Sequence, residues 1–330
     1  MARPRRKLVV AAGLAALVTA APAAQAQPVP RDWPNRPIKV VVPSPAGGPP
    51  DLIIRMIGPK LAAALGQPLV VENRAGAGGV VGTAYLAKQP PDGYHWLFTT
   101  ASHTNIPPFS ENVPYDPVRD FTHVTQAAQN FGQVLVVPTT LPVRSVQDLI
   151  AMAKKDPGRL TYASAGIGTA SHIPAEVMKA ATGTDILLVP YKGVAEVFSD
   201  LVSARVDMFI VGTQIAQQHV QAGKLRALAV TGAKRWKGMP EVPTMQEAGL
   251  KDFNVVNWFG LWLPAGASPE LAARLQAEMA RAMNDPEVRA QFDTQGLEAV
   301  ASRPEDFARF VARESAITMD VARRIGAAKK

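Results

Sequence analysis

The sequence predicts an α/β protein with two lobes, and three observations support this prediction. Strand-like and helix-like segments alternate along almost the whole chain, a pattern typical of α/β layers built on largely parallel sheets. Without its first 26 residues the chain keeps 304 of 330 residues (330 − 26), whereas single hydrophobic cores stop growing near roughly 250 to 300 residues. Two similar strand-to-helix units, far apart in the chain, suit paired crossings between the lobes.

Residues 1–26 have the features of a cleavable secretory signal peptide. Basic residues come first, an apolar stretch from Leu8 to Ala21 follows, and small residues predict cleavage after Ala26. The apolar stretch is shorter than the roughly 20 residues of a membrane-spanning helix. We therefore expect export from the cytoplasm, either by the general secretory route or, because Arg5 and Arg6 are adjacent, by the twin-arginine route.

The first predicted strand, Ile38 to Val42, opens the first lobe. Its β-branched residues suit a buried strand, and a proline ends it. An apolar helical pattern begins after Asp51, with a predicted break or kink at Gly58-Pro59. Further strands are predicted at 69–71 and 96–99, with a glycine-rich turn and a helix between them.

The two proposed crossings between lobes are strands 133–138 and 259–264. Each is followed by a helix with a serine at its N-cap position, Ser145 in the first unit and Ser268 in the second. Their separation of roughly 120 residues suits a lobe of ordinary domain size. We therefore place residues 27–137 and 255–330 in the first lobe and residues 138–254 in the second.

The composition excludes several classes of protein. The absence of cysteine rules out disulfides, thiolate metal sites, a cysteine nucleophile and a lipid-modified cysteine. Four of the eight net positive charges lie in the leader, so the mature chain carries +4 (8 − 4), too little to indicate nucleic-acid binding. The chain has no H-E-x-x-H metal motif, no G-x-x-x-x-G-K-S/T phosphate loop and no G-x-S-x-G elbow. We expect a non-enzymatic binding protein without cofactor or metal.

A glycine pair directly after the first strand marks the first candidate site, residues 46–51. Gly47 and Gly48 can adopt positive φ and have no side chain to block a ligand. We expect their amides, and those of the first helical turn, to point into one cavity that suits an anion, in particular a carboxylate. The loop after strand 96–99 adds polar side chains. The predicted ligand contacts of this lobe are Ala46, Gly47, Gly48, Asp51, Thr100, Ser102 and Asn105.

A second strand-to-glycine turn, residues 160–172, is the expected partner of the first. It supplies hydroxyls and amides before another helix, so each lobe would carry one anion-binding loop with the ligand between them. Small residues are also common in any strand-to-helix turn, so a purely structural role competes with this interpretation. The predicted contacts here are Ser164, Gly166, Gly168, Thr169 and His172.

Five side chains allow both a functional and a structural interpretation. His172 would contact the ligand or act as a base, but a role in holding its loop is favoured because no orienting partner is near in sequence. Tyr191 and Lys192 follow a strand and are expected to reach the cleft, although a loop lysine is more often solvated. Asp207 binds the ligand or, more commonly, caps a buried backbone group. Trp258 forms a wall of the site or fills the hinge core.

Nine segments of the chain, in order and spacing, resemble the substrate-binding proteins of tripartite tricarboxylate transporters, the TctC or Bug family. They are VVPSPAGGPPD with Arg55, LGQPLVVENRAGAGG, PPDGYHWL, PYDPVRDF, LTYASAGIGTASH, VPYKG, GKLRALAVT, VPTMQEAGL and WFGLWLPAGASP. One such segment would be a weak signal, whereas nine in order are specific. They extend over nearly all of the mature chain.

This resemblance implies a periplasmic Venus-flytrap protein of the type II periplasmic-binding-protein class, with two α/β lobes joined by two crossing strands. It implies capture of a small organic carboxylate and its delivery to the integral membrane subunits of a tripartite transporter, by a protein that we expect to be monomeric. Family members hold one carboxylate at the loop corresponding to residues 46–51, through amides and waters. The loop corresponding to residues 164–172 adds amides and hydroxyls.

Some residues depart from the family pattern. Ala195-Glu196 replaces a frequent Pro-Ala, and Ser203-Ala204 replaces a usual glycine pair. An extra acid near a carboxylate site would disfavour tricarboxylates by like-charge repulsion, unless Glu196 faces solvent. The ligand therefore stays open between a dicarboxylate or tricarboxylate, an amino acid and an aromatic acid. An alternative function is a carboxylate-sensing co-receptor for a two-component sensor kinase.

Overall fold

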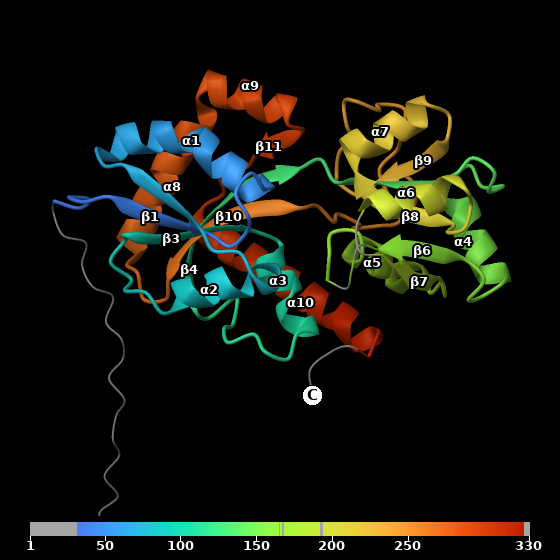
Figure 1. The fold of residues 1–330 in the computed structure, drawn as a ribbon, viewed down its shortest axis with the longest axis horizontal. Helices are drawn as coiled ribbons and strands as arrows, with labels where there is room; N and C mark the ends of the chain where they lie inside the picture. Colours follow the sequence, from blue (N-terminus) through green and yellow to red (C-terminus); the bar gives the residue numbers. More distant parts are fainter. Residues whose placement is uncertain (1–31, 165, 167, 192–193, 327–330) are drawn as a thin grey trace, which may run out of the picture.

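The structure, a computed structural model, describes residues 32–326 except 165, 167, 192 and 193, and shows two α/β lobes side by side (Figure 1). The strands of the first lobe are β1 (Ile38–Val42), β2 (Leu69–Asn73), β3 (His95–Thr100), β4 (Phe121–Asn130), β10 (Trp258–Pro264) and β11 (Leu297–Ala299). Its helices are α1 (Pro49–Leu65), α2 (Val80–Ala87), α3 (Ser102–Asn105), α8 (Pro269–Asn284), α9 (Pro286–Thr294) and α10 (Pro304–Arg324), with 3₁₀ turns η1 (Ala77–Gly79) and η2 (Pro107–Phe109).

The second lobe holds the middle of the chain. Its strands are β5 (Gln133–Pro138), β6 (Thr161–Ser164), β7 (Leu187–Pro190), β8 (Met208–Gly212) and β9 (Leu225–Val230). Its helices are α4 (Val146–Lys155), α5 (Ile173–Thr182), α6 (Val194–Val202) and α7 (Thr213–Gln221). The predicted two-lobed α/β fold is therefore confirmed. None of the helices in the described ranges has the length and apolar character needed to cross a bilayer.

Both sheets are mixed rather than largely parallel. The first has the order β11-β4-β10-β3-β1-β2, in which β1 runs parallel to β2 and β3 while β10 is antiparallel to its neighbours. The second has the order β7-β6-β8-β5-β9, in which β6 runs parallel to β7 and β8 while β5 is antiparallel to its neighbours. The antiparallel strands β5 and β10 are those that enter each sheet directly from the other lobe. They start at the edge where the parallel strands end.

The crossings lie just outside the strands that the sequence suggested. Strand β5 belongs entirely to the second sheet, so the chain leaves the first lobe at Phe131-Gly132 and not within residues 133–138. It returns through residues 255–257 before β10. Residues 133–137 thus sit in the second sheet, whereas the sequence placed them in the first lobe. The boundary near 254 remains a prediction.

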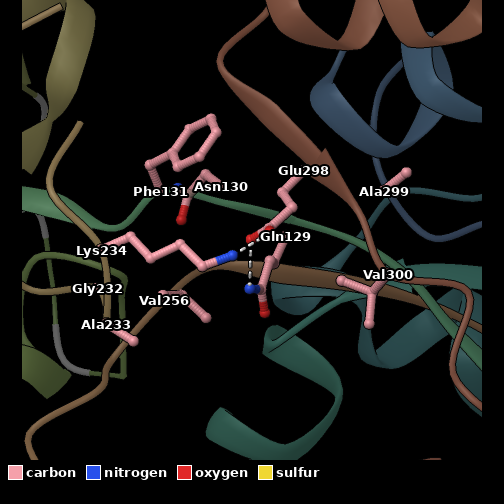
Figure 2. A pocket seen from close by; sticks show the side chains of 10 residues that line it. All are labelled: Gln129, Asn130, Phe131, Gly232, Ala233, Lys234, Val256, Glu298, Ala299 and Val300. Carbon is pink, nitrogen blue, oxygen red and sulfur yellow. Dashed lines mark hydrogen bonds and ion pairs between the residues drawn. The ribbon is translucent and has the colours of Figure 1, made fainter. Parts of the chain in front are cut away.

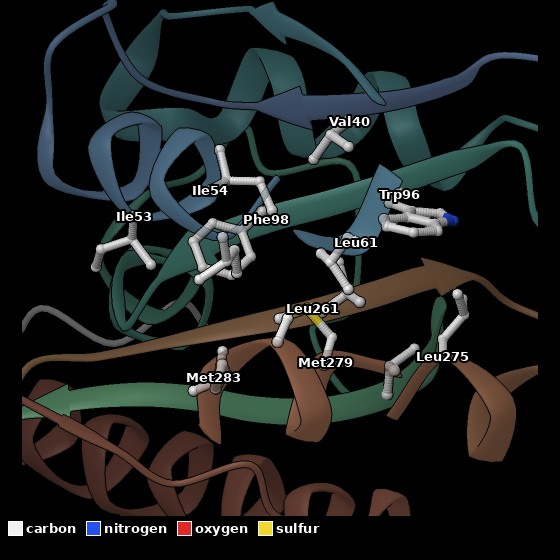
Figure 3. Close-up of a cluster of buried hydrophobic side chains, with 14 of the residues drawn as sticks. Val40, Ile53, Ile54, Leu61, Trp96, Phe98, Leu261, Leu275, Met279 and Met283 are labelled. Atoms are coloured by element: carbon white, nitrogen blue, oxygen red, sulfur yellow. The ribbon is translucent and has the colours of Figure 1, made fainter. Parts of the chain in front are cut away.

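Each sheet is covered by helices on both faces. In the first lobe, α1, α8 and α9 cover one face, and α2 and α10 cover the other. Figure 3 shows Ile54 and Leu61 of α1 packed against sheet residues such as Phe98, with Met279 of α8 nearby. Burying one such side chain stabilises the fold by roughly 1.5–3 kcal/mol. In the second lobe, α4 and α5 cover one face and α6 and α7 the other.

The helix starts follow the predicted signals, with one correction. The Ser145 hydroxyl accepts the Asp148 N–H at 3.0 Å, and the Ser268 hydroxyl accepts the Leu271 N–H at 3.2 Å, so both predicted caps are confirmed. Helix α1 runs without interruption through Gly58-Pro59, so of the two predicted alternatives the break is wrong and the kink stays a prediction. Buried apolar side chains on both sides of the proline hold the two halves against one sheet.

Candidate functional site

The loop between β1 and α1 is held in shape by Asp51, which is only 2% exposed. Its Oδ2 accepts the Gly47 N–H at 2.8 Å, while its Oδ1 accepts Asn73 Nδ2 at 3.0 Å and Arg55 Nε at 2.9 Å. Burial acts to raise the pKa of Asp51, but these hydrogen bonds together outweigh it and hold the pKa below its usual value. The Asp51 carboxylate is therefore used by the protein itself. It positions the loop rather than facing a ligand.

The amides of this loop differ from the prediction. The Gly47 N–H is taken by Asp51, and the Gly48 N–H donates to the Pro45 carbonyl at 3.2 Å. The first two residues of α1 are prolines, which have no N–H to donate. In the described part of the chain, the N–H groups of Ala46 and Asp51 remain without a partner. The donors that the loop can offer an anion are these two, not the glycine amides.

The polar residues after β3 form a second, local network. The Ser102 N–H donates to Thr100 Oγ1 at 3.2 Å, and the two hydroxyls lie 3.0 Å apart. Asn105 Oδ1 accepts the Thr318 hydroxyl of α10 at 3.2 Å. Thr100 and Ser102 thus stay at the edge of the sheet beside the first loop, while the Asn105 side chain is tied to α10.

The second loop is stabilised by its own hydroxyls. Ser164 Oγ accepts the Gly166 N–H at 3.1 Å and donates to the Gly166 carbonyl at 2.8 Å, and Thr169 Oγ1 donates to the same carbonyl at 2.7 Å. Ser164 is fully buried, whereas Gly166 and Thr169 are partly exposed. The hydroxyls of Ser164 and Thr169, which the sequence suggested as ligand donors, thus form hydrogen bonds within their own loop.

His172 anchors the same loop from the start of α5. Its ring is fully buried, and its Nδ1 accepts the Gly168 N–H at 3.3 Å. An acceptor at Nδ1 places the proton of the neutral ring on Nε2. Burial lowers the pKa of His172, so the ring stays neutral near pH 7. This arrangement fits the loop-holding role and not that of an exposed base.

The second loop touches the first lobe at α3 and η2. A Cβ atom placed on Gly168 would lie 3.4 Å from Phe109 Cδ2 and 3.5 Å from the Asn105 carbonyl oxygen. The rings of Phe109 and His172 meet edge to face, with centroids 5.9 Å apart. These are ordinary van der Waals distances, so glycine is favoured at this position by its backbone angle φ of +76° and not by lack of space. The sequence did not identify Phe109, whose position after two prolines gives no chemical signal.

Two further candidates, Asp207 and Tyr191, have structural partners. Asp207 Oδ2 accepts the N–H and hydroxyl of Thr161 at 2.8 and 2.9 Å, at the opposite end of β6 from Ser164. The Tyr191 hydroxyl donates to Asp200 of α6 at 3.0 Å. Asp207 therefore caps backbone, the commoner alternative, and Tyr191 turns into its own lobe. Neither side chain reaches toward the first lobe as predicted.

Trp258 fills the core and does not form a wall of the site. It is fully buried and packs against Trp262 and Phe307, with centroids 5.9 Å away in each case. Its Nε1 donates to Glu314 Oε2 at 3.4 Å. Burial raises the pKa of Glu314 despite this hydrogen bond. The remaining candidate, Lys192, lies outside the described residues.

A pocket of about 460 Å³ lies between the lobes and begins at the first turn of α1. We call it the amide-lined pocket. Its lining consists of Pro49, Leu52, Ile53, Met56, Asn130, Gln214, Asn257, Phe259, Thr294, Gln295 and Leu297. Gln214 of α7 is the lining residue from the second lobe. Its Nε2 donates to the Gln295 carbonyl of the first lobe at 3.1 Å, so this hydrogen bond joins the two lobes at the pocket. None of these positions was predicted, because neutral amides at separated positions form no motif.

Figure 2 shows a second pocket of about 300 Å³ at the hinge, where an ion pair joins the lobes. Lys234 Nζ, from the segment after β9, lies 2.7 Å from Glu298 Oε1 of β11, and Gln129 Nε2 donates to Glu298 Oε2 at 3.0 Å. Gly132 and Gly232 lie back to back beside this pair, and a side chain on either would collide with backbone of the opposite segment. The crossing is therefore narrow and backbone-packed, as suits a hinge.

Comparison with known proteins gives a consistent result. A model of the tripartite tricarboxylate transporter family receptor, TctC, matches residues 53–326. BugT of Bordetella pertussis is 35% identical over 308 residues, which are 92% of this chain and 94% of BugT. The structure of R. palustris Rpa4515 with adipate is 35% identical, with a TM-score of 0.71 and coverage of 90% of this chain and 99% of that one. MatC from Rhodopseudomonas palustris with bound malate is 29% identical, with a TM-score of 0.67 and coverage of 88% and 99%.

The matched region begins just after the first loop and takes in the hinge, the second loop and most of both lobes. Its sequence likeness and fold likeness agree, and the nine segments noted in the sequence fall largely inside it. The chain therefore belongs to the tripartite tricarboxylate transporter receptor family, the TctC/Bug solute-binding proteins, whose members are periplasmic substrate-binding receptors and not enzymes.

Proposed function

We propose that this protein captures a small organic carboxylate between its lobes and delivers it to the integral membrane subunits of a tripartite tricarboxylate-type transporter. We further propose that residues 1–26 direct export and are removed after Ala26. The relatives with adipate and with malate bound support a carboxylate as the ligand. The family match supports a transporter as the partner.

The unpaired N–H groups of Ala46 and Asp51 carry the carboxylate proposal. They lie at the start of the 17-residue helix α1, where the helix dipole adds a partial positive charge. Strands β1 and β3 are parallel neighbours, so this loop shares an edge of the sheet with Thr100 and the segment after it. That segment contacts the second loop through Phe109 and His172. A carboxylate at this edge would meet donors of one lobe beside a loop of the other.

A ligand panel tests the proposal. We expect at least one small carboxylate to raise the melting temperature of the exported, mature protein and to bind with one-to-one stoichiometry in calorimetry. A ligand at 100 times its Kd stabilises by about 2.7 kcal/mol. Each acid is paired with its uncharged diamide or diol, which we expect to produce no shift. A panel in which no carboxylate binds, or in which the uncharged analogues bind equally well, contradicts the proposal.

A further inference from the structure

We propose that the body of the ligand occupies the amide-lined pocket and that this receptor prefers an acid with a single carboxylate, an apolar body and an uncharged far end. This inference rests on the proposed function. The class of carboxylate is inferred from the side chains that line the pocket, whereas the carboxylate itself was inferred from the amides of the loop. The expected order is a monocarboxylate over a matched dicarboxylate, and both over a tricarboxylate.

The pocket is continuous with the carboxylate-binding loop. Pro49, one of its lining residues, directly follows Gly48, and Phe259 pairs with Thr100 at the end of β3. On the other lobe, Gln214 follows β8, which is parallel to β6. Gln214 and Ser164 therefore lie at the same edge of the second sheet. A ligand anchored at the first loop would extend along α1 between these two edges.

Among the residues that the structure describes, the lining of the pocket contains no ionisable side chain. Leu52, Ile53, Met56, Phe259 and Leu297 give it an apolar floor. A carboxylate moved into such a site loses its hydration without gaining a cation, and this cost is several kcal/mol unless the charge is paired. The apolar floor favours methylene or aromatic groups instead, in proportion to the area that they bury.

The nearest basic residue on α1 is already engaged. Arg55 pairs with Asp51 through Nε and donates from Nη2 to Asn73 Oδ1 at 3.2 Å. Its side chain is also 50% exposed, so solvent screens the charge that remains. Arg55 therefore supports the loop and does not offer the pocket a second cationic site.

Two partly buried side-chain amides, those of Asn130 and Asn257, remain for the far end of the ligand. Asn130 Oδ1 accepts the N–H groups of Gly132 and Asn257 at 3.1 and 3.0 Å, which directs its NH₂ group away from these bonds. Within the described residues, neither that NH₂ group nor the Asn257 side chain has a hydrogen-bond partner. Neutral amides of this kind suit a hydroxyl, an amide or an ester.

The test uses three six-carbon acids: adipate, its monoamide and tricarballylate. By calorimetry at pH 7, we expect the monoamide to bind at least tenfold more tightly than adipate, and adipate more tightly than tricarballylate. In the Leu52→Arg variant, which adds a cation at a 45% exposed position in the pocket, we expect adipate to gain at least tenfold relative to the monoamide. Val70→Arg is the control, because Val70 is also 45% exposed but lies on β2 outside the pocket.

The outcomes separate this inference from the proposed function. Wild-type protein that binds none of a wide carboxylate panel overturns both. Wild-type protein that binds adipate or tricarballylate at least as well as the monoamide overturns the inference alone. The inference also fails if Leu52→Arg leaves the wild-type order unchanged, or if Val70→Arg shifts the order as strongly.

Discussion

Replacement of Asp51 by alanine is expected to lower the affinity for a carboxylate by about 10- to 100-fold while the protein stays folded. The Asp51 carboxylate holds Gly47, Asn73 and Arg55 in place through bonds of 2.8 to 3.0 Å. Hydrogen bonds to charged groups contribute about 1.5–3 kcal/mol each, and about 1.4 kcal/mol corresponds to tenfold in affinity. Without the carboxylate, the Gly47 N–H loses its acceptor and the loop loses its single conformation before it can bind.

Asp148→Ala is the matched control for this variant. Asp148 accepts the N–H of Arg144, four residues before it, at 2.9 Å, just as Asp51 accepts the N–H of Gly47. Asp148, however, lies at the start of α4 in the second lobe. We expect Asp148→Ala to leave the affinity unchanged and to cost less stability than Asp51→Ala, because Asp148 is exposed and Asp51 is buried. Calorimetry together with thermal melts makes the comparison. Wild-type affinity in a folded Asp51→Ala protein would show that the first loop does not hold the ligand.

Acidification is expected to produce the largest change in stability, through the buried histidines, chiefly His103 and His123. Burial lowers the pKa of His103 to about 3, against the opposing hydrogen bond to the Pro117 carbonyl, and burial lowers the pKa of His123 to about 4. Below pH 6.5 the unfolded chain binds protons at these sites and the folded chain does not, so stability falls as the pH falls. The loss is about 1.4 kcal/mol per pH unit for each histidine. Between pH 6.5 and 4.5 the pair would cost on the order of 5 kcal/mol.

Urea unfolding at pH 7 and pH 5 measures this effect. We expect His123→Phe to reduce the dependence on pH by less than half in this range, because His103 and His172 remain buried with lowered pKa values. His219 in α7 is partly exposed, and we expect His219→Gln to change the dependence much less. Glu314 acts in the opposite direction, because its raised pKa favours the folded state at low pH. A stability that is constant from pH 7 to pH 5 would contradict the account of the buried histidines.

The elements that local chemistry determines could be predicted from the sequence. Strand β1 follows from its β-branched residues, and the starts of α4 and α8 follow from Ser145 and Ser268. Strand β4 was missed because its sequence, FTHVTQAAQN, is largely polar and is buried only through tertiary pairing with β10 and β11. The mixed sheets could not be predicted either, because the antiparallel directions of β5 and β10 depend on the tertiary path by which the chain enters each sheet from the other lobe.

The candidate site was predicted in its loops but not in the roles of its side chains. Both glycine loops are where the sequence placed them, because strand-to-glycine-to-helix turns are local features. Asp51, Asp207 and Trp258 instead find their partners in Asn73, Thr161 and Glu314. Those partners are 22, 46 and 56 residues away, so no local pattern could reveal that these side chains are already occupied.

Capture of the ligand between the lobes is the central claim; we expect it to draw the lobes together about the hinge, so a distance between the lobes tests it most directly. The chain has no cysteine, so Gln218→Cys in α7 and Gln291→Cys in α9 allow specific spin labelling. Both positions are exposed, and each lies four residues from the Gln214–Gln295 contact that joins the lobes. Figure 1 shows α7 and α9 on the same side of the molecule, one on each lobe. We predict that a saturating carboxylate shortens and narrows the distance distribution, and an unchanged distribution with the ligand bound would contradict the account.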